Sequence, residues 1–378
     1  MVIVREGKAR IYIPTRQTVF YNSEMRVNRD ITVLFLAALD VNRNIRLMDA
    51  LAATGVKAIR IALESGGIEK MVLNDINKYA YQVMMENVRL NELESVSECR
   101  NEDAGYTLLR DAISGNYYTY IDLDPFGSPV NFVEPALKAL EKNGFLGVTA
   151  TDLTVLFGVY PKKCFRIYNA LNKKTDFHKE IGLRILAGFI ARKAALIGKS
   201  LEFLLAYYEK HYLRIFFTLK SSRKDLNDYL FDNLGFIGYC QSCGWYKPIN
   251  LNMEDLVVNC PICESKISLI GPLWVKKINN LEFIKKMVAK IHTLDHIRRK
   301  RIHKILLGLM EEDPNILGYY DLDKLSERFG IPSLGLNDVI EEIKSYGYAA
   351  SKTHIYTKGL KTNCPFNLLL KIIKNHHF

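Results

Sequence analysis

The sequence predicts an α/β protein in which a doubly wound, mainly parallel sheet is followed by a cysteine-rich module and a second, α+β region. Between residues 45 and 151, five short apolar runs alternate with amphipathic stretches, which is typical of right-handed βαβ units. Four of the seven cysteines fall between residues 235 and 274. Beyond residue 280 the spacing of apolar residues becomes helical again.

The first 44 residues precede this alternation and are expected to cap the substrate and cofactor site. The segment VIVREGKARIYIP predicts a β-hairpin with its turn near Gly7. An irregular stretch follows, and the run ITVLFLAAL predicts a helix over residues 31–39.

Residues 45–234 are predicted to form the sheet domain. Its five strands are expected in the runs IRLMD, MVLND, SVSECRNED, YYTYIDLD and FLGVTATD. Residues 180–198 have a helical period, and LEFLLAYYEKHYLRIFFTL alternates in the manner of two paired strands that extend the sheet.

Acidic residues end several of the predicted strands, where ligands of open α/β sheets bind. The turn after Asp49 contains one glycine, Gly55, and lacks the GxGxxG pattern of dinucleotide sites. We therefore expect a nucleoside ligand without a pyrophosphate, and Asp49 and Asp75, at the ends of two successive strands, are expected to bind it. Asp75 can accept both hydroxyls of a ribose and Asp103 the amino group of adenine, a combination that fits S-adenosylmethionine. Each acid alone could equally cap a helix.

The segment DLDPFGSP, residues 122–129, follows the fourth strand. Asp124 can accept a hydrogen bond from an exocyclic amine, Pro125 removes a competing backbone donor, and Phe126 offers a stacking face. A base would have to leave its helix to reach these groups. A simple D-P-x-G turn explains the aspartate, proline and glycine equally well.

Two CxxC pairs, CQSCG and CPIC, place Cys240, Cys243, Cys260 and Cys263 at a spacing close to that of zinc ribbons. We expect residues 235–274 to form a module held by one structural zinc ion. Two disulfides or a redox CxxC are the alternatives. The other three cysteines, Cys99, Cys164 and Cys364, are expected to be unpaired.

The net charge of +11 and the pI near 9.1 favour a polyanionic partner, with nucleic acid as the first class to consider. Residues 275–378 are expected to bind the nucleic acid, because three helices and a hairpin follow each other there in winged-helix order. The expected contacts are Arg298, Arg299 and Arg301 in the basic run 296–304, and Lys352, His354, Lys358 and Lys361 in the hairpin. The basic run could also be only a solvated helix face.

The chain resembles the tRNA guanosine-26 N2,N2-dimethyltransferase family of archaea and eukaryotes. The resemblance rests on VFYNSEMRVNRD, DALAATGVKAIR, NDIN, NEDA, DLDPFGSP, the CxxC pairs, GPLW and SKTHIYTKGLKT, which span nearly the whole chain. It implies a Rossmann-like S-adenosylmethionine-dependent methyltransferase domain with a C-terminal zinc-ribbon and winged-helix-like α+β region.

The same resemblance implies roles for single residues. It places Arg29, Arg60, Asp75, Asp103 and Ala104 at S-adenosylmethionine. It makes Asp124 the residue that orients the guanine amine, with the base held between Phe20 and Phe126. One departure is Lys57, at a position where a glycine or small residue is expected.

The function expected from these observations is methylation of the N2 amine of guanosine 26 in tRNA. An amino-methyltransferase for another RNA base or position is one alternative. A zinc-ribbon and winged-helix factor that binds RNA without catalysis is the other. No run of apolar residues is long enough for a membrane helix, and the N-terminal residues lack a secretory pattern, so we expect a cytoplasmic protein, and we expect it to be a monomer.

Overall fold

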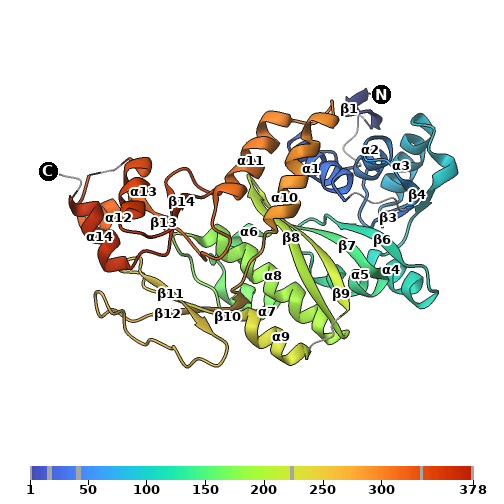
Figure 1. The fold of residues 1–378 in the computed structure, drawn as a ribbon. Helices are drawn as coiled ribbons and strands as arrows, with labels where there is room; N and C mark the ends of the chain where they lie inside the picture. Colours follow the sequence, from blue (N-terminus) through green and yellow to red (C-terminus); the bar gives the residue numbers. More distant parts are fainter. Residues whose placement is uncertain (1, 15–18, 40–43, 222–224, 333–334, 376–378) are drawn as a thin grey trace.

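A seven-stranded sheet forms the centre of the computed structural model, which describes residues 2–14, 19–39, 44–221, 225–332 and 335–375 (Figure 1). The strands are β3 (Ile45–Asp49), β4 (Ile68–Asn74), β5 (Ser97–Arg100), β6 (Tyr118–Leu123), β7 (Leu140–Ala150), β8 (Lys199–Glu209) and β9 (Tyr212–Ser221). Their order is β5-β4-β3-β6-β7-β9-β8. The first five are parallel, and β9 and β8 extend the sheet as an antiparallel pair. The predicted doubly wound sheet and its strand-pair extension are confirmed.

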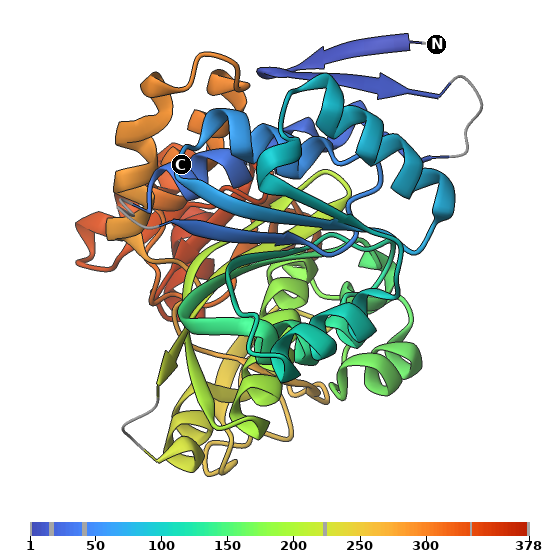
Figure 2. The ribbon, with the colours of Figure 1, turned by 90° about the vertical axis from the view of Figure 1, so that its right-hand side faces the viewer.

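Helices cover both faces of this sheet (Figure 2). One face carries α1 (Arg26–Ala37), α2 (Val56–Glu64) and α3 (Lys78–Leu90), and the other carries α4 (Ala104–Ile113), α5 (Val130–Ala139) and α8 (His178–Leu196). Successive strand residues point to opposite faces. Leu47 and Tyr120 accordingly pack in the core under α1, whereas Met48 and Ile121 pack in the core under α8.

The turn between β3 and α2 depends on its single glycine. Gly55 caps α2 with a φ of 76°, a conformation that side chains rarely adopt. A Cβ atom at this position would lie 2.9 Å from Leu73 Cδ2. The glycine therefore allows a sharp strand-to-helix turn that is packed closely against β4.

The N-terminal hairpin consists of β1 (Val2–Glu6) and β2 (Ala9–Ile13), with Gly7 at a φ of 63° in the turn, as the sequence predicts. It packs on α3, where the Asn87 side chain accepts a hydrogen bond from the Tyr12 N–H at 2.6 Å. After the short helix η1 (Ser23–Met25), α1 begins at Arg26, five residues before the helix that the apolar run predicts. The difference arises because its first turns bury polar side chains, Asp30 among them, that no apolar pattern reveals.

The cysteine-rich module is a three-stranded antiparallel sheet. It contains β10 (Leu234–Tyr239), β11 (Tyr246–Asn250) and β12 (Ser268–Trp274) in the order β11-β10-β12. It packs on α8, where a Cβ atom on Gly188 would lie only 3.0 Å from the backbone nitrogen of Trp274. Arg184 of α8 also donates a hydrogen bond to the Trp274 carbonyl.

The C-terminal region contacts both the sheet domain and the cysteine-rich module, where the Tyr320 ring lies against that of Tyr246. Helices α10 (Leu281–Lys290) and α11 (Arg299–Glu311) pack on α1. The elements that follow are β13 (Tyr320–Asp321), α12 (Leu322–Phe329), α13 (Leu336–Ser345), β14 (Ala350–Lys352), β15 (Gly359–Thr362) and α14 (Phe366–Asn375), with strand order β13-β15-β14. The order of α12, α13 and the β14–β15 hairpin is that of a winged helix.

The described residues also contain the short α-helices α6 (Leu153–Leu156), α7 (Pro161–Tyr168) and α9 (Leu226–Asn233), and the 3-10 helices η2 (Glu94–Val96) and η3 (Ile291–Thr293). Within the described residues, none of the helices combines the length and apolar character that a membrane crossing requires.

Candidate active site and metal centre

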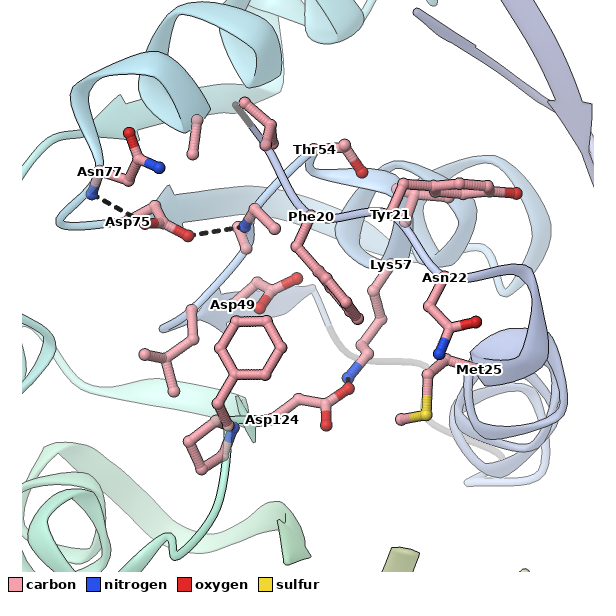
Figure 3. Close-up of a pocket in the computed structure, with 18 of the residues that line it drawn as sticks. Phe20, Tyr21, Asn22, Met25, Asp49, Thr54, Lys57, Asp75, Asn77 and Asp124 are labelled. Carbon is pink, nitrogen blue, oxygen red and sulfur yellow. Dashed lines mark hydrogen bonds and ion pairs between the residues drawn. The ribbon is translucent and has the colours of Figure 1, made fainter. Parts of the chain in front are cut away.

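A cavity of about 560 Å³ lies at the edge of the sheet where the parallel strands end (Figure 3). Asp49 ends β3, Asp75 follows β4, and Asp124 follows β6, so that three neighbouring strands each contribute a carboxylate to its wall. On the other side the cavity is closed by Phe20, in the segment before α1, and by Arg29, in the first turn of α1. Of the catalytic and cofactor residues predicted from the sequence, the structure brings the following together here: Phe20, Arg29, Asp49, Asp75, Asp124, Pro125 and Phe126.

The carboxylate of Asp75 is fixed by two backbone hydrogen bonds. Its Oδ2 accepts from the Ala53 N–H and its Oδ1 from the Asn77 N–H, both at 2.9 Å. Each carboxylate oxygen has two lone pairs, so both keep the capacity to accept from a ligand in the cavity. The arrangement suits a pair of adjacent hydroxyls.

Asp49 is a buried acid that faces the cavity. Neither carboxylate oxygen has a hydrogen-bond partner of standard geometry among the described residues, and the Leu51 N–H gives only weak support. Burial raises the pKa of Asp49 to about 7, although the cation of Lys57 opposes this shift. An unpaired buried carboxyl group of this kind is costly, and a cationic ligand group would relieve the cost.

The Lys57 ammonium connects the two carboxylates of the DLDPFGSP segment. Its Nζ lies 2.6 Å from Asp122 Oδ1 and 2.6 Å from Asp124 Oδ2. Figure 3 shows the lysine side chain extending to Asp124 along the cavity wall. Asp122 also pairs with the buried Arg214. Burial alone would raise the pKa of Asp122, but Arg214 and Lys57 outweigh burial and hold that pKa well below its usual value.

Lys57 is therefore a site residue that the sequence analysis missed. The long Lys57 side chain reaches two carboxylates at the end of β6, Asp122 and Asp124, and supplies the counter-charge that they require. His211, in the β8–β9 turn, also lines the cavity and was not predicted. Lys57 pairs with acids more than sixty residues away in the sequence, and His211 reaches the cavity from a distant turn. The spacing of residues in the sequence gives no signal for either position.

The rings of Phe20 and Phe126 touch each other at the mouth of the cavity. Their centroids are 4.6 Å apart and their planes meet at 83°. Phe20 is 50% exposed and Phe126 is 76% exposed, values that are high for phenylalanine. A flat base held between them needs two stacking contacts of about 3.5 Å each, so the rings must separate and turn to receive one.

Arg29 is held toward the cavity by the N-terminal hairpin. Its Nε and Nη2 donate to the two carboxylate oxygens of Glu6, each at 2.6 Å. Burial alone would raise the pKa of Glu6, but Arg29 and Arg60 outweigh burial and lower it to about 2. The hairpin thus supplies the anion that fixes the arginine.

Arg60 was expected at the cofactor but does not line the cavity. Its side chain is fully buried and its guanidinium is engaged by Glu6, by Asp30 at 2.6 Å and by Glu64. The expectation of direct contact is corrected accordingly: Arg60 reaches the cavity only through Glu6 and Arg29.

Asp103 and Ala104 lie at the start of α4, after β5, and outside the lining of this cavity. The Asp103 side chain is exposed and caps the helix by accepting from the Tyr106 N–H at 2.9 Å. The neighbouring Asn101 amide donates to the Asp75 carbonyl at 2.8 Å, which ties this strand end to that of β4. The two residues are therefore close to the Asp75 side of the site.

The three predicted RNA-binding arginines lie at the start of α11. The Arg298 side chain is exposed. Arg299 forms an ion pair with Asp295 at 2.7 Å, and Arg301 forms one with the buried Glu209. Two of the three guanidinium groups are thus already engaged by carboxylates.

In the hairpin, the structure corrects two expected RNA contacts. Lys361 is 4% exposed and its Nζ lies 3.5 Å from Glu312. His354 Nδ1 lies 2.5 Å from the same carboxylate and its side chain is also buried. These two side chains turn inward and contact buried acids, so they are not available to phosphates. The other two predicted contacts are Lys352, which is exposed, and Lys358, which is half-buried.

The four predicted metal ligands form a separate cluster. The Sγ atoms of Cys240, Cys243, Cys260 and Cys263 all lie within 4.8 Å of one another. The closest pairs are Cys240 with Cys263 at 3.4 Å and Cys243 with Cys260 at 3.5 Å. Four thiolates in a tetrahedral arrangement around Zn²⁺ have similar separations, and such a set leaves no open coordination position. The donor set therefore fits a structural zinc ion.

The chain is similar over nearly its whole length to proteins of known family. The family model of N2,N2-dimethylguanosine tRNA methyltransferases matches residues 1–374. A Pyrococcus furiosus protein named tRNA (guanine(26)-N(2))-dimethyltransferase is 35% identical over 392 residues, which cover 99% of this chain and 98% of that protein. A Methanosphaera stadtmanae protein of the same name is 31% identical, with 98% and 96% covered. The structure of Trm1 from Pyrococcus horikoshii with S-adenosyl-L-methionine has a TM-score of 0.89 and 34% identity, covering 99% of this chain and 100% of that one.

Proposed function

The chain belongs to the N2,N2-dimethylguanosine tRNA methyltransferase family, and from that premise we propose that it methylates the N2 amine of guanosine 26 in tRNA, giving N2-methyl- and N2,N2-dimethylguanosine. Two relatives are named for this reaction, and the similarity to them covers nearly their full length. The proposal rests mainly on the Asp124 carboxylate, which Lys57 holds on the wall of the cavity that the exposed rings of Phe20 and Phe126 also line.

S-adenosylmethionine is the methyl donor that fits the cavity. Asp75 would accept the two ribose hydroxyls, and Asp49 would pair with the ammonium of the methionine part. Arg29 would face the methionine carboxylate, with Arg60 as its support. Asp103, beside the Asp75 strand end, stays a proposed contact of the adenine amino group, and Ala104 stays a proposed contact of S-adenosylmethionine. When bound, the donor supplies an electrophilic methyl group on a sulfonium.

Asp124 would orient the amine of guanine. The nitrogen lone pair is delocalised into the ring, so the chain's main task is to hold the amine in line with the methyl group. The Asp124 carboxylate can accept an N–H hydrogen bond and stabilise the positive charge that develops on the nitrogen. As the N–C bond forms, the C–S electron pair stays on sulfur, and the amine proton leaves to Asp124 or to water.

Phe20 and Phe126 would hold the base after it leaves the tRNA stack. Their contact in this structure closes the place where a guanine would lie, so entry of the base requires the rings to separate. Stacking on both faces would compensate part of the unstacking cost in the RNA.

A methylation assay on two transcripts tests the proposal. Purified protein is incubated with labelled S-adenosylmethionine and a tRNA transcript carrying either guanosine or adenosine at position 26, and the product nucleosides are identified by nuclease digestion and mass spectrometry. We expect label in N2-methyl- and N2,N2-dimethylguanosine with the first transcript only. Label at another base supports a different amino-methyltransferase, and binding without label supports a non-catalytic RNA-binding factor. The monomeric state and the cytoplasmic location stay predictions.

A further inference from the structure

The short helix α7 (Pro161–Tyr168) presents exposed aromatic and basic side chains beside the active site. Cys164 and Tyr168, four residues apart, face the core and are fully buried. The opposite side of the helix is exposed, with Phe165 at 56% and the preceding Tyr160 at 55%. Single exposed rings are common on protein surfaces, and what distinguishes this helix is that two of them lie close together among cations.

Three cations lie between and beside these rings. Lys162, Lys163 and Arg166 are exposed, and among the described residues none of them forms an ion pair. This contrasts with Arg299 and Arg301, which the sequence favoured for RNA and which are paired with carboxylates. We call Tyr160, Lys162, Lys163, Phe165 and Arg166 the α7 patch.

Hydrogen bonds join the buried side of α7 to the loop that carries the proposed catalytic residues. The Ser128 hydroxyl donates to the Tyr168 hydroxyl at 2.9 Å, and Tyr168 donates to Asp152 at 2.9 Å. The same loop is tied to the end of β7, because the Gly127 N–H donates to Thr151 Oγ1 at 2.7 Å. The α7 patch therefore keeps a fixed position relative to Phe126 and the cavity.

We propose that the α7 patch is a docking surface for tRNA, on which the cations contact phosphates and the rings stack on unpaired bases near the methylated nucleotide. This inference rests on the proposed function and extends it to a surface. Unpaired lysines and arginines interleaved with exposed aromatic rings match the chemistry of RNA, which offers a charged backbone and accessible base faces. An acidic, apolar protein partner is the other class that such a surface could attract.

Charge removal on and away from the α7 patch tests this inference. The test variant replaces Lys162, Lys163 and Arg166 with alanine. The control replaces Lys142, Lys199 and Lys220 with alanine and so removes the same net charge. These lysines lie at the ends of β7, β8 and β9 that are away from the cavity. Both are compared with the full-length wild type by filter binding to a tRNA transcript over a range of salt concentrations and by steady-state methylation.

In the test variant we expect the tRNA Kd and KM to rise on the order of tenfold or more, and the slope of log affinity against log salt to fall by about two. Its kcat at saturating tRNA and its affinity for S-adenosylmethionine should stay at wild-type levels, which also shows that it folds. A Phe165→Ala variant should lose affinity without a change in the salt slope, because stacking releases no counterions.

The inference is overturned if the test variant binds tRNA as the control does while the wild type methylates tRNA. In that case the α7 patch serves another partner and the proposed function stands. If the wild type neither binds nor methylates the transcript, the proposed function fails and the docking surface fails with it.

Discussion

The Lys57 ammonium lies 2.6 Å from a carboxylate oxygen of Asp124 and equally close to Asp122, so a single buried cation positions the acid at the end of β6. Nothing else among the described residues bonds the Asp124 side chain. The orientation of this carboxylate in the cavity thus depends on a residue of a different element, α2.

Replacing Lys57 with methionine should therefore lower kcat by roughly tenfold or more, because Asp124 loses its fixed position. The free energy of unfolding should also fall by about 1.5 to 3 kcal/mol, since charge-assisted hydrogen bonds in a buried site are lost. Lys57→Arg keeps the charge and should recover most of the stability. Urea unfolding and single-turnover methylation measure both effects, and a wild-type kcat in Lys57→Met would show that Asp124 needs no such support.

The raised pKa of Asp49 predicts a pH dependence of stability. The folded-state pKa of about 7 exceeds the reference value of 3.8, so the folded chain keeps a proton that the unfolded chain releases in this range. The contribution of this carboxyl to stability is full below about pH 4, falls as the pH rises toward 7, and is constant above that. Asp49→Asn should remove this part of the pH dependence when unfolding is measured from pH 4 to 8.

The same carboxyl should link S-adenosylmethionine binding to pH. If Asp49 pairs with the ammonium of the donor, it must be ionised in the complex, so the affinity should increase between about pH 5.5 and 7. Calorimetric titration of the wild type and Asp49→Asn at several pH values measures the difference. Parallel pH profiles for the two proteins would remove Asp49 from the methionine end of the site.

Asp75→Ala should weaken S-adenosylmethionine binding by roughly 2 kcal/mol or more, because a charged acceptor of two hydroxyls is lost. Asp313 offers a matched control: its Oδ1 accepts from the N–H of Asn315 at 2.9 Å, as that of Asp75 does from Asn77, and it does not line the cavity. Asp313→Ala should leave the dissociation constant unchanged. Equal constants for both variants would contradict the ribose assignment.

The cysteine cluster predicts one zinc ion per chain. Replacing Cys240 and Cys243 with serine should remove the metal and loosen residues 235–274, while the central sheet stays folded. Cys99→Ser, at a cysteine outside the cluster, should keep the metal. Elemental analysis and hydrogen exchange follow both properties. Protein prepared without chelator and found free of zinc would defeat the assignment.

The sequence predicts those parts of the structure that local patterns determine. The alternation of runs predicts the sheet, and the CxxC spacing predicts a cluster in which all four sulfur atoms lie within 4.8 Å. Strand ends likewise predict that Asp49, Asp75 and Asp124 share one wall, although Asp103, which follows β5, lies outside the cavity lining.

Contacts between distant segments account for what the sequence did not predict. Lys361 is a surface cation by its local pattern, but Glu180, far away on α8, pairs with it at 3.0 Å and keeps it buried. The sequence suggested a small residue at the position of Lys57. Its two acidic partners come close to it only because β6 pairs with β3 in the folded sheet. Arg60 does not line the cavity, because its guanidinium pairs with Glu6 of the N-terminal hairpin.

The measurement that tests the account most directly is single-turnover methylation of a saturating tRNA transcript by Asp124→Asn, with filter binding on the same preparation. If the carboxylate orients the amine chiefly in the transition state, the rate should fall on the order of a hundredfold or more while the affinities for tRNA and S-adenosylmethionine stay close to those of the wild type. A wild-type rate in Asp124→Asn would contradict the catalytic role of this residue, and a parallel loss of tRNA affinity would assign it to docking or folding instead.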